Sequence, residues 1–110
     1  MKNLFLALLV LATTSALAQP KKIDTVCIKT SAQCGDCKDR IESTLNFQKG
    51  VKFAELNLET NVVTCVFKPK KTNATVLRIA LSNAGYDADE VKAIPSAVLQ
   101  LPKCCQPGGH

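Results

Sequence analysis

The sequence predicts an α+β fold with the element order strand, helix, strand, strand, helix, strand. Residues 25–30 and 51–58 alternate between apolar and polar side chains, as half-buried strands do. Residues 62–67 form a β-branched run that ends shortly before a proline. Two stretches, 37–48 and 73–84, space their apolar side chains with the period of a helix. Short connections join these segments, as in one small domain.

The first strand leads into a polar loop and then the first helix. Alternation places Val26 and Ile28 on one face of this strand and Cys27 on the other. The loop covers 31–36, after which apolar residues recur at a spacing of four until Gly50 ends the helix.

The second half of the chain predicts a hairpin, a helix and a short strand. A polar turn at 59–61 joins the two middle strands, and Thr72 or Asn73 can cap the second helix, which Gly85 ends. Residues 89–93 predict a last, short strand. This order is that of the ferredoxin-like βαββαβ sandwich, in which a four-stranded antiparallel sheet carries two helices on one face.

A cysteine-containing tail at 95–110 follows the predicted domain at 23–94. A disordered tail is one interpretation. We expect instead a short helical or extended segment over part of the open sheet face, because its apolar side chains would otherwise be exposed to water. These side chains are Val98, Leu99 and Leu101, together with Ile94 just before the tail.

The first 18 residues predict a secretory signal peptide. A lysine precedes an apolar run at 4–12, and Ala16-Leu17-Ala18 matches the small-x-small pattern of a cleavage site. The apolar run is about half the length that a membrane anchor needs, and no cysteine for lipid attachment follows the site. We therefore expect a periplasmic or secreted protein with residues 1–18 removed.

Charge and composition argue against nucleic acid as a partner. The full chain carries a net charge of +5, and its basic residues are scattered without a long block. It has one Tyr and no Trp, which leaves little aromatic surface for stacking on bases. We expect a solvated basic surface and a monomer.

The tight cysteine pair Cys34 and Cys37 is the strongest chemical signal in the chain. The two thiols span a loop and the first turn of a helix, whose free amide groups favour thiolate. Two thiolates without a fixed third ligand suit a soft ion such as Cu(I) or Hg(II), whereas structural Zn(II) normally takes four ligands. The pair therefore predicts a soft-metal site, with Zn(II) the less favoured ion.

With these motifs the sequence resembles the heavy-metal-associated (HMA) domain family, which includes copper chaperones and periplasmic mercury-binding proteins. The resemblance covers about residues 25–93. It rests on Cys34-x-x-Cys37 opening a helix after a strand, on Gly50-Val51 after that helix, and on Ala84-Gly85-Tyr86-Asp87 after the second helix.

The resemblance implies that Cys34 and Cys37 are metal ligands and that Tyr86 lies near the metal loop, where it shapes access without coordinating. An ordinary core tyrosine is the alternative. The sequence departs from the family in carrying Ala32 where methionine is usual and Gln33 where threonine is usual. These departures bear on the rigidity of the loop and on metal preference.

The adjacent pair Cys104 and Cys105 lies beyond the ordinary domain. The last strand of this fold runs away from the metal loop, so the tail has to double back to reach Cys34 and Cys37. About ten residues span ~15 Å as a helix or ~33 Å extended, which allows a return. The second pair then either adds one or two thiolates to the metal site or forms a disulfide with the first pair in the absence of metal. A detached thiol site and a structural disulfide are the alternatives.

The other candidate ligands are isolated in the sequence. Cys65 alternates with Val63 and Phe67 and is expected to be buried, whereas Cys27 is expected on the open face, where it could meet the tail. Opposite faces argue against a disulfide between these two cysteines. His110 is a terminal residue and a weak candidate ligand.

The predicted function is binding and transfer of a heavy-metal ion in the cell envelope, without catalysis. Transfer would proceed by thiolate exchange with a thiol-rich membrane transporter or a metal-transporting ATPase. The alternative is a thiol–disulfide exchange protein that uses the same CxxC pair. A regulatory module of an export system is a third interpretation.

Overall fold

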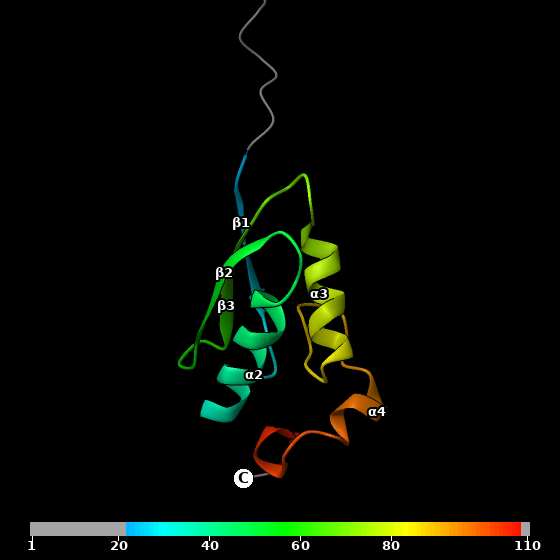
Figure 1. Ribbon diagram of the computed structural model, residues 1–110. Coiled ribbons are helices and arrows are strands. Elements are labelled where there is room, and N and C mark those ends of the chain that lie inside the picture. The colour runs from blue at the N-terminus through cyan, green and yellow to red at the C-terminus, as the bar shows by residue number, and fades with distance from the viewer. Residues whose placement is uncertain (1–21, 109–110) are drawn as a thin grey trace, which may run out of the picture.

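The computed structural model describes residues 22–108, so the expected signal peptide at 1–18 and His110 lie outside the described residues. A three-stranded antiparallel sheet in the order β1-β3-β2 packs against two main helices, α2 and α3 (Figure 1). Within 22–108, no helix is both long and apolar enough to cross a membrane. The elements are β1 Asp24–Lys29, α2 Gly35–Asn46, β2 Val51–Asn57, β3 Val62–Phe67, α3 Ala74–Asn83, α4 Pro95–Val98 and the short 3-10 helix η2 Lys103–Cys105.

The strand alternation predicted from the sequence is confirmed. Along β1, Ile28 is fully buried while Cys27 is exposed, and along β3 the odd-numbered side chains are the buried ones. The buried sides of the strands join one apolar core with the inner faces of α2 and α3. Burial of this core is the main force that holds helices and sheet together.

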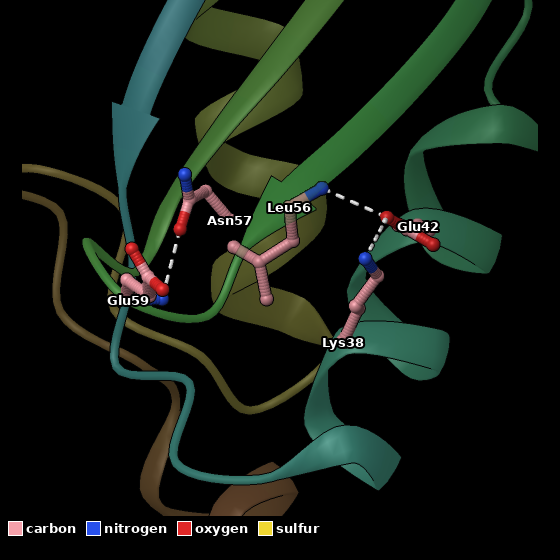
Figure 2. Close-up of polar contacts among 5 residues, drawn as sticks. All are labelled: Lys38, Glu42, Leu56, Asn57 and Glu59. Atoms are coloured by element: carbon pink, nitrogen blue, oxygen red, sulfur yellow. Dashed lines mark hydrogen bonds and ion pairs between the residues drawn. The ribbon is translucent and has the colours of Figure 1, made fainter.

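Side chains of α2 bind the outer edge of β2. The Glu42 carboxylate accepts the backbone N–H of Leu56 at 2.8 Å, and Lys38 Nζ lies 3.9 Å from the same carboxylate (Figure 2). One turn later, Asn46 Oδ1 accepts the N–H of Ala54 at 3.1 Å. A separate contact in Figure 2, between Asn57 and Glu59, closes the turn that follows β2. These bonds fix the position of α2 along the sheet, and with it the cysteine at the start of the helix.

The predicted start of the first helix is late by two residues. The helix begins at Gly35, so Cys34 is its N-cap residue and Cys37 lies in its first turn. The second helix is capped as predicted, because Asn73 Oδ1 accepts the N–H of Val76 at 3.0 Å.

The predicted fourth strand at 89–93 is wrong: residues 22–108 contain a three-stranded sheet. Ala88 makes only isolated bridges, one with Thr30 and one with Val91. Between the two bridges the chain reverses at Asp89, whose φ of 53° lies in the left-handed region. The chain therefore turns back at the loop end of β1 before it can run along that strand.

Asp89 stabilises this reversal through its side chain. Its carboxylate accepts the backbone N–H of Lys29 at 2.9 Å and the Nε–H of Arg78 at 2.8 Å, while its own N–H donates to the Lys29 carbonyl at 2.8 Å. The carboxylate thus takes the place that a backbone carbonyl of a fourth strand would take beside Lys29.

Asp89→Asn is expected to lower the free energy of unfolding at neutral pH by about 1 kcal/mol, since it removes the charge from a partly exposed ion pair. Burial raises the pKa of Asp89, but the hydrogen bonds from Arg78 and Lys29 and the charge of Arg78 outweigh it and lower the pKa below its ordinary 3.8. The stability advantage of wild type over Asp89→Asn is therefore complete at pH values above the ordinary pKa of 3.8. It is lost as the pH falls through the pKa of Asp89 in the folded state.

Urea unfolding at neutral pH and at a series of pH values below 4 checks this expectation. Glu90→Gln, at the exposed neighbouring position, is the matched control and should leave stability unchanged at neutral pH. A wild-type advantage that persisted at the lowest pH would contradict the assigned role of Asp89.

The tail does not cover the open face of the sheet, so that expectation is wrong. Because the chain has already reversed at Asp89, the tail starts near the loop that carries Cys34 and has no need to double back. Figure 1 shows α4 and η2, in orange and red, continuing to the N-terminal end of α2. Of the apolar tail side chains, Leu101 is buried at 8% exposure, whereas Leu99 stays 77% exposed.

Gly85 is the point on which the tail packs. Its φ of +100° is a left-handed conformation, and a Cβ there would lie 3.0 Å from Leu101 Cδ1 and 3.1 Å from the Ala97 carbonyl oxygen. Glycine at this position therefore lets the tail backbone approach the end of α3. Gln106 Nε2 donates to the Leu101 carbonyl at 2.9 Å and holds the last turn of the tail.

Candidate metal centre

The two cysteines of the CxxC pair meet at the N-terminus of α2. Cys34, the N-cap residue, is half-buried, and Cys37 is fully buried. Their Sγ atoms lie 3.4 Å apart. Extended backbone at Cys34 (φ −154°) followed by the helix turns both sulfur atoms to one side of the loop.

The structure also brings the tail cysteines to this pair. Cys34 Sγ lies 3.3 Å from Cys104 Sγ and 3.7 Å from Cys105 Sγ, and the two tail sulfur atoms are 3.9 Å apart. Cys34, Cys104 and Cys105 place their sulfur atoms within 4.8 Å of one another. All the cysteines of the described chain are free thiols, so the four form a thiol cluster, which we define as Cys34, Cys37, Cys104 and Cys105.

The thiols of this cluster differ in acidity. The backbone N–H of Cys37 and, to a smaller extent, hydrogen bonds with the neighbouring thiols lower the pKa of Cys34 to about 7, against an opposing effect of burial. Interaction with Cys34 raises the pKa of Cys104, and burial raises that of Cys105. Near neutral pH, a large fraction of Cys34 is therefore thiolate, whereas the raised pKa values of Cys104 and Cys105 keep the tail thiols protonated.

Tyr86 lies behind the thiol cluster and is fully buried. Burial raises the pKa of its phenol, and the adjacent Cys105 and Cys37 raise it further. Its hydroxyl is buried without a hydrogen-bond partner among the described residues. A phenol O–H beside sulfur atoms is positioned to donate to a thiolate that forms there.

Asp36 stands on the exposed side of the cluster. It belongs to the first turn of α2, and its carboxylate accepts a hydrogen bond from Cys104 Sγ at 3.6 Å. The aspartate between the two CxxC cysteines thus contacts the tail. The sequence carried no signal for this pairing, because 68 positions separate the two residues.

Cys65 and Cys27 lie away from the cluster. Cys65 is fully buried in the core, as predicted, and burial raises its pKa to about 11. Cys27 is exposed on the opposite face, with its Sγ 3.8 Å from Thr64 Oγ1 in β3. The suggestion that Cys27 meets the tail is therefore wrong, because the tail packs at the loop end of the molecule.

Comparison with protein-family models matches residues 31–87 to the heavy-metal-associated domain. Among curated proteins, copper chaperone CopZ of Staphylococcus aureus is 39% identical over 54 residues, which are 49% of this chain and 79% of CopZ. A copper-exporting P-type ATPase of Staphylococcus epidermidis is 39% identical over 56 residues, but these are only 7% of the ATPase.

Solved structures show the same fold. A CopZ metallochaperone matches with a TM-score of 0.57 at 30% identity, over 59% of this chain and 98% of that one. Oxidized MerP from Ralstonia metallidurans matches with a TM-score of 0.59 at 24% identity, over 61% of this chain and 94% of that one. The matched segment, 31–87, contains the CxxC pair and Tyr86 and ends before the tail. From its match to the family model over half of its length, the chain belongs to the heavy-metal-associated domain family.

Proposed function

We propose that this protein binds a soft heavy-metal ion through Cys34 and Cys37 and passes it to a thiol-rich partner, without catalysis. The observation that carries the proposal is the pair of sulfur atoms 3.4 Å apart at the start of α2, in a chain of the HMA family. A Cys34 pKa of about 7 supports it further, because thiolate is the form that coordinates metal.

Cu(I) is the favoured ion, with Hg(II) next and Zn(II) less favoured. Thiolate ligands select soft ions, and the relatives named above are copper proteins by their printed names. The match to a copper-exporting ATPase supports a metal-transporting ATPase as the partner. Transfer would proceed by thiolate exchange: a partner thiolate bonds to the ion, and one protein sulfur then leaves.

Residues 1–18 support export to the periplasm or the outside of the cell, by their apolar run and small-residue cleavage pattern. We propose that the mature chain starts at Gln19 and acts in the cell envelope as a monomer. An oxidising compartment would require the thiol cluster to be kept reduced or loaded with metal, since a disulfide has no thiolate to offer.

Anaerobic titration of the reduced mature protein with Cu(I), Hg(II) and Zn(II), against competing chelators, tests the proposal. We expect tight binding of Cu(I) and Hg(II) and much weaker binding of Zn(II). Tighter binding of Zn(II) than of Cu(I), or no binding of any of the three, would contradict it.

Thiol–disulfide exchange is tested in parallel by insulin reduction with the same protein. A metal carrier should show little turnover above the rate of dithiothreitol alone. Turnover comparable to that of a thioredoxin, together with weak metal binding, would replace the carrier function by the redox function.

A further inference from the structure

We infer that Cys104 and Cys105 complete a three-thiolate metal site with Cys34, so that the tail holds the ion together with the CxxC loop. This inference rests on the proposed function, since it assigns further ligands to the same ion. It makes Cys34 the shared ligand of two alternative sets: one with Cys37 in the loop, and one with the two tail cysteines.

The sulfur positions fit three-coordinate binding. With a metal–sulfur bond of about 2.3 Å, sulfur atoms lie about 4.0 Å apart in a trigonal site and about 4.6 Å apart in a linear one. The three distances among Cys34, Cys104 and Cys105 are 3.3, 3.7 and 3.9 Å, all within about 0.7 Å of the trigonal value. Cys34 and Cys37, at 3.4 Å, would have to separate by about 1 Å to bind an ion linearly.

The position of the tail cysteines is fixed by packing. Leu101 is buried against Gly85, where a side chain would collide with it, and Cys105 itself is only 2% exposed. Gln106 closes the turn onto the Leu101 carbonyl at 2.9 Å. Such contacts hold the two tail thiols close to the loop before any ion arrives, so little conformational entropy has to be lost on binding.

Only three of the four sulfur atoms of the thiol cluster, those of Cys34, Cys104 and Cys105, all lie close to one another. Cys37 is near Cys34 but does not belong to the group whose sulfur atoms all lie within 4.8 Å of one another. Structural Zn(II) sites usually need four ligands in a tetrahedron, whereas a soft ion accepts three thiolates. The site is therefore suited to Cu(I) or Hg(II).

When the tail binds the ion, the S–H bond of each tail thiol is replaced by a sulfur–metal bond. The oxidation states of the sulfur and of the metal do not change. Each protonated tail thiol releases its proton to solvent as its sulfur bonds to the ion. A third thiolate on the ion is also what transfer requires of a partner protein. The tail thus supplies within the chain a ligand that a partner would otherwise supply, so the ion is held more tightly until a partner thiolate replaces one of the protein sulfur atoms.

The test compares Cu(I) affinity and the number of bound sulfur atoms, by competition with chelators and by X-ray absorption, on reduced protein. The variant is Cys104→Ser/Cys105→Ala, in which alanine avoids an unpaired hydroxyl at the buried position. Cys27→Ser, at an exposed cysteine outside the cluster, is the matched control. Cys34→Ser/Cys37→Ser shows whether the loop pair is required at all, and circular dichroism checks that each variant is folded.

We expect three sulfur ligands in wild type and in Cys27→Ser, and two in the tail variant, with an affinity about 100-fold lower. Wild-type affinity and coordination in the tail variant, with loss of binding in Cys34→Ser/Cys37→Ser, would overturn this inference and leave the proposed function intact. Absence of Cu(I) binding by wild type would overturn this inference, and absence of Hg(II) and Zn(II) binding as well would overturn the proposed function too.

Discussion

Cys34→Ser should lower Cu(I) affinity by about 1000-fold, whereas Cys37→Ser should lower it by only about 10-fold. Cys34 Sγ lies 3.4 Å from Cys37, 3.3 Å from Cys104 and 3.7 Å from Cys105, so its loss removes a ligand from both alternative sets. Loss of Cys37 still leaves Cys34 and the two tail thiols. Chelator competition on the two reduced single variants measures the difference.

The asymmetry separates a site of two thiolates from one that includes the tail. In a site made only by the CxxC pair, each cysteine supplies half of the ligands, and both variants should lose affinity to the same extent. Equal losses would therefore show that the tail cysteines contribute no bond. Cys65→Ser is a poor control here because it buries an unpaired hydroxyl, so the exposed Cys27→Ser is the comparison to use.

Ile41→Ala should lower the free energy of unfolding by about 2–5 kcal/mol. Ile41 is fully buried on the face of α2 that also carries Cys37 and Leu45, so its truncation leaves a cavity between the helix and the sheet. For a domain of this size the loss corresponds to a fall in Tm of about 8 °C or more. Thermal unfolding of the reduced, metal-free protein measures it.

Phe47→Ala is the matched control for this prediction. Phe47 lies just after the same helix and is 88% exposed, so removal of its ring should change stability by no more than about 0.5 kcal/mol. Equal effects of the two substitutions would mean that α2 does not pack on the core through Ile41.

The sequence predicted those parts of the fold that depend on local pattern. Alternation around Ile28 and the β-branched run at 62–67 identified two strands, alternation gave their buried faces, and Asn73 marked the start of α3. The CxxC pair could be assigned to a helix N-terminus because spacing alone brings Cys34 and Cys37 together. In each case the signal lies within a few residues of the feature that it predicts.

The wrong predictions, of a fourth strand and of the course of the tail, concern features that depend on contacts between residues far apart in the sequence. The chain reverses at Asp89 because its carboxylate binds Lys29 and Arg78, which lie 60 and 11 positions away. Nothing in the five residues of the expected last strand reveals these partners. The wrong prediction of the course of the tail followed from the same error, since a chain that reverses at Asp89 already lies near the loop that carries Cys34.

The tail also shows why apolar composition alone does not locate a segment. Leu99 and Leu101 are equally apolar, yet only Leu101 is buried, because only it meets the space that Gly85 leaves open. The fit of the side chain against Gly85 determines which of the two leucines is buried. A pattern of apolar residues in the sequence does not predict such a fit.

The bonds from α2 to the edge of β2 have a consequence for association between copies of the chain. The backbone N–H groups of Ala54 and Leu56 are already taken by Asn46 and Glu42 (Figure 2 shows the Glu42 bond). A strand from another molecule that paired along this border would have to break both bonds and displace two polar side chains. Edge-to-edge growth of the sheet into aggregates is thereby disfavoured at β2.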